Sequence, residues 1–186
     1  GSASVTLKAT KTFPHAAHWT NSTFYFRPLR QTTVKGKTDA NPWLSWTFNE
    51  SGSLQKTEIP GRAAMAKFTV NGPAILFGAA LEGNDGITID NFSMRGSTGT
   101  TLANIPDNTL REFNAIRPYD LIILQFGVNA VKDNSTTKDM RDYLAQMRNV
   151  IRKFRRCYPQ ASILVVSTPD RGSKEGGATM PNIKAL

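Results

Sequence analysis

The stretch DLIILQFGVNAV, residues 120–131, decides the fold class. An apolar run that ends abruptly in Gly-x-Asn predicts a buried parallel strand that delivers a polar side chain to a site. In open α/β sheets, the ligand crevice lies beyond the carboxyl ends of the strands. Gly127 would let the chain turn sharply there, so that the amide of Asn129 faces the crevice. Asn129 is therefore the first candidate site residue.

The surrounding residues, 91–186, alternate helix and strand, which predicts an α/β unit. Helices are expected over 106–118 and 136–159, and strands over 120–126 and 161–167. In the long helix, apolar residues at steps of three and four predict one face that packs on the sheet. Thr136 or Thr137 can cap its start, with Asp139 in the first turn. The basic residues near its end complement the helix dipole.

A matching element lies upstream, in ITIDNFSMRGSTGTTL, residues 87–102. The alternating apolar residues Ile87 and Ile89 predict a strand, and a loop that contains Gly96 and Gly99 follows it. The residues before this element, 1–90, predict an all-β domain. Its short apolar runs are separated by turn-forming residues at spacings typical of a β-sandwich of jelly-roll-like kind. Strands are expected within 4–10, 22–29, 42–48, 65–70, 74–81 and 86–90. The predicted domains are therefore 1–90 and 91–186.

Three segments carry a family resemblance: DNFSMRGSTG (90–99), FGVNAV (126–131) and ILVVSTPDRG (163–172). Together they resemble the SGNH (GDSL-like) hydrolases, especially the bacterial branch that deacetylates carbohydrates and carries an inserted β-rich domain. The resemblance covers residues 88–186. It implies part of a flavodoxin-like, three-layer α/β/α fold and a Ser-His-Asp esterase that removes acetyl or similar acyl groups from a carbohydrate. It also implies a periplasmic, secreted or cell-surface location, and it requires no cofactor and no metal.

The resemblance assigns two site residues. In that family, a loop glycine and the Asn of a Gly-x-Asn-Asp motif help form the oxyanion hole, and these roles carry over to Gly96 and Asn129. Donors of this kind hold the negative charge that develops on oxygen. Ala130 stands where the family has Asp. Ser93 and Ser97 flank the loop, but neither has a Gly-x-Ser-x-Gly setting, and neither is assigned as the nucleophile.

The family's nucleophile block, Gly-Asp-Ser, does not occur in the chain, and neither does its Asp-x-x-His block. The only histidines are His15 and His18. The segment 179–186 begins like a helix, with Pro181 near its first turn, and then stops after about one and a half turns. We therefore expect an internal piece of a longer enzyme, inactive on its own.

The β domain is rich in aromatic residues, and one of them is a candidate for binding sugar. Alternation places Trp43, Ser45 and Thr47 on one face of a strand and Leu44, Trp46 and Phe48 on the other. Trp43 therefore has polar neighbours, and an exposed indole could stack on a sugar ring. The alternative is burial in the core. A second function class follows, a non-enzymatic carbohydrate-binding or cell-surface interaction protein.

The formal charge is +9, with +3 in residues 1–90 and +6 in residues 91–186. The excess gathers at the end of the long helix without a recognisable nucleic-acid motif, so a solvated helix face is favoured over nucleic-acid binding. No run approaches the roughly 18 apolar residues of a membrane span. The spacing of His15 and His18 fits metal ligands on a helix, but ordinary surface histidines are favoured. The single Cys157 predicts a small, partly buried residue rather than a reactive thiol.

Overall fold

The structure is a computed structural model that describes residues 1–10, 12–13, 16–130, 132 and 134–168. The chain divides into two compact units, unit 1 (Gly1–Asn91) and unit 2 (Phe92–Leu186). Each is described by itself. The segment 179–186 and the last four residues of ILVVSTPDRG lie outside the described residues, as does His15.

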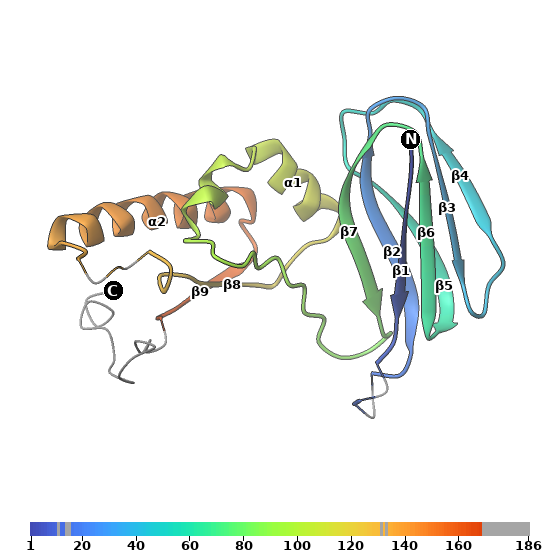
Figure 1. Cartoon of the computed structure of the whole chain (residues 1–186), viewed down its shortest axis with the longest axis horizontal. Helices are drawn as coiled ribbons and strands as arrows, with labels where there is room; N and C mark the ends of the chain where they lie inside the picture. Colours follow the sequence, from blue (N-terminus) through green and yellow to red (C-terminus); the bar gives the residue numbers. More distant parts are fainter. Residues whose placement is uncertain (11, 14–15, 131, 133, 169–186) are drawn as a thin grey trace. The chain divides into compact units, whose positions relative to one another are not determined.

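Unit 1 is a sandwich of two antiparallel sheets (Figure 1). Sheet A has the strand order β1-β6-β3-β4, and sheet B has the order β5-β2-β7. The strands are β1 (Ser2–Lys8), β2 (Trp19–Pro28), β3 (Thr32–Thr38), β4 (Leu44–Phe48), β5 (Gln55–Ala63), β6 (Met65–Asn71) and β7 (Ala74–Glu82). The predicted β-sandwich is confirmed, while the jelly-roll likeness stays a prediction.

Aromatic residues from both sheets form the core of unit 1. Phe24 of β2 stacks on Phe68 of β6, with ring centroids 5.0 Å apart, and both rings are buried. Gly36 of β3 makes room for this packing, since a Cβ there would lie 2.8 Å from Cδ1 of Ile59. Apolar residues of strands such as β3 and β6 alternate inward, so the two sheets close one core between them.

Three strand predictions for unit 1 need correction. The predicted runs omit β3, because its sequence TTVKGKT is mostly polar, and β5, because it contains Pro60 and Gly61. Strand β5 tolerates the proline because it lies at the edge of sheet B. The segment 86–90 was expected to be a strand, but it has no regular secondary structure, and Ile87 and Ile89 are exposed. Alternation alone does not make a strand where no neighbouring strand pairs with it.

Unit 2 contains a short parallel sheet and a layer of helices (Figure 1). Its elements are η1 (Thr100–Asn104), α1 (Asp107–Ile116), β8 (Leu121–Gln125), α2 (Thr137–Cys157) and β9 (Ser162–Val166). Strands β8 and β9 pair in parallel, from Leu121 opposite Ser162 to Gln125 opposite Val166. A helix joins the two strands, as a parallel pair requires.

The long helix α2 begins and packs as its sequence predicts. Thr136 is the N-cap, and it forms a capping box with Asp139, in which each side chain accepts the other residue's backbone N–H. The buried stripe includes Met147 and Val150, which pack against Leu124 of β8. The apolar face of α2 therefore covers one face of the parallel sheet.

The other face of that sheet overturns part of the prediction. Strand β8 was expected to be buried, yet Leu121 and Ile123 are 48% and 58% exposed. In the part of unit 2 that the structure describes, both helices pack against Ile122, which faces away from these residues. The described residues thus form two layers, and the three-layer α/β/α fold stays a prediction.

Candidate functional site

The Gly96 turn lies at the start of unit 2. The backbone N–H of Ser97 donates to the carbonyl oxygen of Met94 at 3.1 Å, which closes a tight turn around Gly96. Gly96 has a φ of +81°, a conformation that glycine adopts without strain. Nothing lies within 4 Å of the position that a Cβ would take there. The backbone of Gly96 is therefore exposed, with open space beside it.

Gly99 fixes this turn to the end of strand β8. Its φ is +84°, and a Cβ at Gly99 would lie 2.5 Å from Cγ of Phe126. Phe126 follows the last residue of β8 directly. Only a residue without a side chain allows so close an approach, so Gly99 holds the loop 94–99 against the carboxyl end of the strand.

Asn129 reaches the same loop from the other side. Gly127, with a φ of +130°, opens a turn that the N–H of Ala130 closes by donating to the carbonyl of Gly127 at 2.8 Å. The Nδ2 of Asn129 donates to the carbonyl oxygen of Ser97 at 3.2 Å. An amide nitrogen carries two hydrogens, and this bond uses one of them. The structure thus brings the two predicted elements together, with Asn129 beside the Gly96 turn.

The oxyanion roles of Gly96 and Asn129 nevertheless stay predictions. The Asn129 side chain is tied to a loop 32 positions away in sequence rather than to its own turn. Of the two flanking serines, Ser97 is engaged locally, because its Oγ accepts the N–H of Gly99 at 3.1 Å. Asn129 therefore contacts the loop that contains Gly96, and the convergence of these two donors on one oxygen stays a prediction.

Tyr143 of α2 makes a contact to the loop that the sequence analysis did not single out. Its spacing belongs to the apolar stripe of the helix, but its hydroxyl donates to the carbonyl oxygen of Thr98 at 3.0 Å. Burial raises the pKa of Tyr143, so the hydroxyl stays protonated and able to donate. The signal available in the sequence was a tyrosine at an apolar position of the predicted helix, because the hydroxyl of a buried tyrosine usually finds an acceptor.

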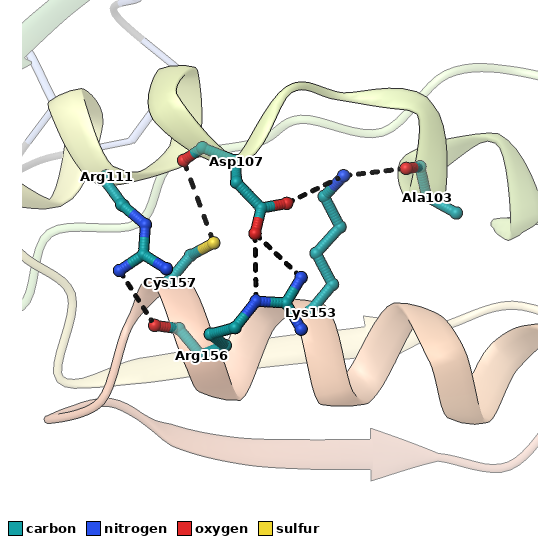
Figure 2. A network of polar contacts seen from close by, with 6 residues as sticks. All are labelled: Ala103, Asp107, Arg111, Lys153, Arg156 and Cys157. Atoms are coloured by element: carbon teal, nitrogen blue, oxygen red, sulfur yellow. Dashed lines mark hydrogen bonds and ion pairs between the residues drawn. The ribbon is translucent and has the colours of Figure 1, made fainter.

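A polar network behind the loop ties α1 and η1 to the end of α2 (Figure 2). Arg156 donates to Oδ2 of Asp107 from Nε at 2.9 Å and from Nη2 at 2.7 Å. Lys153 lies 3.2 Å from Oδ1 of Asp107 and donates to the carbonyl of Ala103 at 2.7 Å. These two cations hold the pKa of Asp107 below its ordinary value, with the bonds from Arg156 contributing most.

This network changes the interpretation of the basic residues on α2. Lys153 and Arg156 belong to the run that raised the question of nucleic-acid binding, and both are paired within unit 2. Cys157 is buried beside them, with Sγ 3.8 Å from the carbonyl oxygen of Asp107. Burial raises the pKa of its thiol, which opposes formation of a reactive thiolate. The network therefore stabilises the packing of α1 and η1 against α2.

Unit 1 offers a second candidate surface around Trp43. The indole is 47% exposed, and the ammonium of Lys37 lies 5.1 Å from its ring centroid, a cation–π distance. Trp46 and Phe48 pack against the core instead, as predicted, but Leu44, predicted on the same face, is 38% exposed. The exposure of Trp43 excludes the core alternative, while its role in binding sugar stays a prediction.

The remaining candidates give no site among the described residues. His18 accepts a hydrogen bond at Nδ1 from Arg62, at 3.0 Å. Within the described ranges, no group of three or more His, Cys, Asp or Glu residues is arranged to hold a metal ion. In the same ranges, no helix has both the length and the apolar character that a membrane span requires.

No protein-family model matches the chain, and no curated protein matches it. Solved structures similar to it include a family-two carbohydrate esterase from Clostridium thermocellum in complex with cellohexaose, at 11% identity over 95% of this chain and 73% of that one, with a TM-score of 0.30. The family-two carbohydrate esterase from Cellvibrio japonicus matches at 11% identity over 94% and 82%, with a TM-score of 0.28.

A carbohydrate-binding module, TmCBM61 in complex with β-1,4-galactotriose, is also similar. It matches at 14% identity over 42% of this chain, with a TM-score of 0.28, and the chain spans 54% of its length. Because TM-scores in this range do not establish a shared fold, we base the proposals below on the residues of this chain.

Proposed function

We propose that this chain is the middle part of an SGNH-type serine esterase that removes acetyl or similar acyl groups from a carbohydrate. In this proposal, unit 2 supplies the oxyanion hole. The observation that carries it is the hydrogen bond from Asn129 to the carbonyl of Ser97, at 3.2 Å. That bond supports the proposal because it holds a side-chain amide at the loop that contains Gly96, whose backbone N–H is the second donor we propose.

The proposed chemistry is acyl transfer in two steps. A serine attacks the ester carbonyl while a histidine accepts its proton, and the carbonyl oxygen becomes negative. The remaining N–H of Asn129 and the backbone N–H of Gly96 would hold that charge. The nucleophile and the base would come from sequence that flanks this chain. From the resemblance alone, we also propose a periplasmic, secreted or cell-surface location.

A simple assay tests whether this chain lacks the nucleophile and the base. The chain alone should give no turnover of a chromogenic acetyl ester above a buffer control, because it contains no matched nucleophile or base. Turnover that a serine-directed inhibitor abolishes would contradict this and reveal a triad within the chain.

The oxyanion role is tested in the full-length enzyme by Asn129→Ala. Loss of one such donor typically lowers kcat by about 10²–10³, or about 2.7–4 kcal/mol, with little change in substrate binding. Asn149→Ala is the matched control, because Asn149 is exposed on α2. Normal kcat in the Asn129 variant would show that Gly-x-Asn is only a turn.

A second candidate function rests on Trp43. We propose that unit 1 binds carbohydrate through this exposed indole, either as a module of the esterase or in a protein without enzymatic activity. A Gly-Asp-Ser block upstream and an Asp-x-x-His block downstream would favour the esterase. Trp43→Ala should abolish glycan binding with the far-UV spectrum unchanged, and unaltered binding would leave the indole without this role.

A further inference from the structure

Most residues on the outer face of sheet A are hydroxyl-bearing residues or lysines. Alternation and register place the outward residues, since Thr33 and Thr47 pair directly and their hydroxyls lie 3.3 Å apart. Inward residues of the same strands, such as Phe68 and Val34, are buried in the core. The outward set consists mostly of hydroxyls and lysines, with one amide and one methionine: Ser2, Ser4, Thr6, Lys8, Thr33, Lys35, Lys37, Ser45, Thr47, Met65, Lys67, Thr69 and Asn71.

This face carries positive charge without compensation from its own strands. Strands β1, β3, β4 and β6 contain four lysines and no Asp or Glu. Asp39 directly follows β3 in the sequence. Its carboxylate accepts hydrogen bonds from the backbone N–H groups of Ala64 and Met65, at 3.0 and 3.1 Å. The excess of positive charge in unit 1 therefore concentrates on one surface.

Two of the lysines oppose each other. Lys37 of β3 and Lys67 of β6 are direct partners in the antiparallel register. Like charges at such positions are destabilising. Among the described residues, neither lysine forms an ion pair. An anion bound between the two ammonium groups would offset this repulsion.

The outer face of sheet B shows the contrast. There Lys56 lies 2.8 Å from Glu58, and Arg62 donates to His18 at 3.0 Å. Lys56 of sheet B is thus paired with an acid, whereas among the described residues the lysines of sheet A form no ion pair, and Lys37 contacts the Trp43 ring.

The opposed lysines lie in one row with Trp43. Because Gly36 pairs with Leu44, continuation of the register places Lys37 opposite Trp43, and the cation–π distance of 5.1 Å agrees. The row Lys67–Lys37–Trp43 crosses three neighbouring strands, which is about 10 Å at the usual strand spacing. It presents two ammonium groups, then an aromatic ring, and the next row consists of Thr69, Lys35 and Ser45.

We propose that the outer face of sheet A binds an acidic saccharide, with a ring carboxylate between Lys37 and Lys67 and a sugar ring stacked on Trp43. The inference rests on the proposed carbohydrate-binding role of unit 1 and names its ligand class. Charge complementarity selects the carboxylate, the indole selects a ring with an apolar face, and the hydroxyls of Thr69 and Ser45 supply neutral hydrogen bonds beside them.

The test compares two ligands that differ only in their carboxylates: tetragalacturonate and the corresponding neutral galactose tetrasaccharide. Binding is measured with the full chain by calorimetry and by tryptophan fluorescence. Tetragalacturonate should bind at least about tenfold more tightly than the neutral ligand, and Lys37→Gln with Lys67→Gln should remove that advantage, because a hydrogen bond to a charged group is worth about one such factor. Lys56→Gln on sheet B, with the same loss of charge, should leave binding unchanged.

The outcomes separate the two proposals. Equal affinity for both ligands, insensitive to the lysine variants but lost in Trp43→Ala, would overturn the acidic class and leave carbohydrate binding intact. Absence of binding to either ligand would overturn both. Tighter binding of a single-stranded oligonucleotide than of tetragalacturonate would overturn the inference in favour of nucleic acid. As an independent check, Lys67→Gln alone should melt no lower than the parent chain, since it relieves the like-charge pair and keeps the contact between Lys37 and Trp43.

Discussion

The sheets of the two units differ in the residues on their two faces and in which faces are covered. In unit 1, strands such as β3 and β6 place polar residues outward and apolar residues inward, and two sheets close one core. In unit 2, strands β8 and β9 carry apolar residues toward both faces, but helices cover only one of them within the described residues. The contrast shows that an apolar run predicts a parallel strand correctly without showing which of its residues are buried.

The largest effect is expected in the closed core of unit 1. Phe68→Ala should destabilise this unit by about 3–5 kcal/mol, because Phe68 is fully buried and stacks on Phe24. All three tryptophans lie in unit 1, so denaturant unfolding followed by tryptophan fluorescence reports on it. Both α-helices of the described residues lie in unit 2, so the far-UV helix signal serves as the internal control and should change little. A loss below about 1 kcal/mol would contradict a tightly packed sandwich.

The next effect distinguishes the two faces of β8 within one strand. Leu124→Ala should cost about 2–5 kcal/mol, because Leu124 packs against Met147 and Val150. Leu121→Ala, the same chemical change on the exposed face, should cost less than half as much. The measurement is denaturant unfolding followed by the helix signal. Equal losses would mean that Leu121 is covered in solution and that the two units differ less than described.

A smaller effect tests how the loop is held to the sheet. Gly99→Ala combines a strained φ of +84° with a Cβ only 2.5 Å from Phe126, and we expect a loss of about 2–4 kcal/mol. Gly96→Ala has a similar φ of +81° but open space, so it should cost only about 1–2 kcal/mol. The difference between these variants, measured by the helix signal, isolates the contact with Phe126. Equal effects would show that backbone strain alone matters.

Sequence patterns predicted local structure well where one periodicity dominated. The apolar stripe of α2 was predicted by its spacing, and its cap was predicted at Thr136 or Thr137; the structure selects Thr136 and adds a capping box with Asp139. Strand β3 was missed because its inward positions include Gly36, which removes the apolar signal. The segment 86–90 was overpredicted, since Ile87 and Ile89 alternate like strand residues but find no pairing partner in the described structure. Pairing depends on the rest of the fold, and alternation does not report it.

For the candidate site too, motif spacing predicted part of the arrangement but not the contacts that depend on packing. Motif spacing pointed to Gly96 and Asn129, and the structure brings their loops together. The supporting contacts depend on residues distant in sequence, such as Tyr143 bonding to Thr98 and Gly99 fitting against Phe126. Likewise, the basic run on α2 gave no sign that Asp107, some 49 positions away, accepts Arg156. Such pairings arise only when the helices pack.

The smallest effect concerns this ion pair, which joins α1 to the helical layer of unit 2. The folded pKa of Asp107 is lowered by Arg156 and then Lys153, so its contribution to stability is present above the unfolded value near 3.8 and is lost as pH falls through the lower folded pKa. Asp107→Asn should therefore lower the melting temperature slightly at neutral pH, and the difference from the parent chain should shrink below about pH 4.

The matched control is Asp142→Asn, which breaks the more exposed pair with Lys138 on α2 and should change stability less at every pH, because exposed pairs contribute little. The helix signal should register the Asp107 change, while tryptophan fluorescence should not. A difference between Asp107→Asn and the parent chain that persists at low pH would show that Asp107 acts through its position at the start of α1 rather than through its charge.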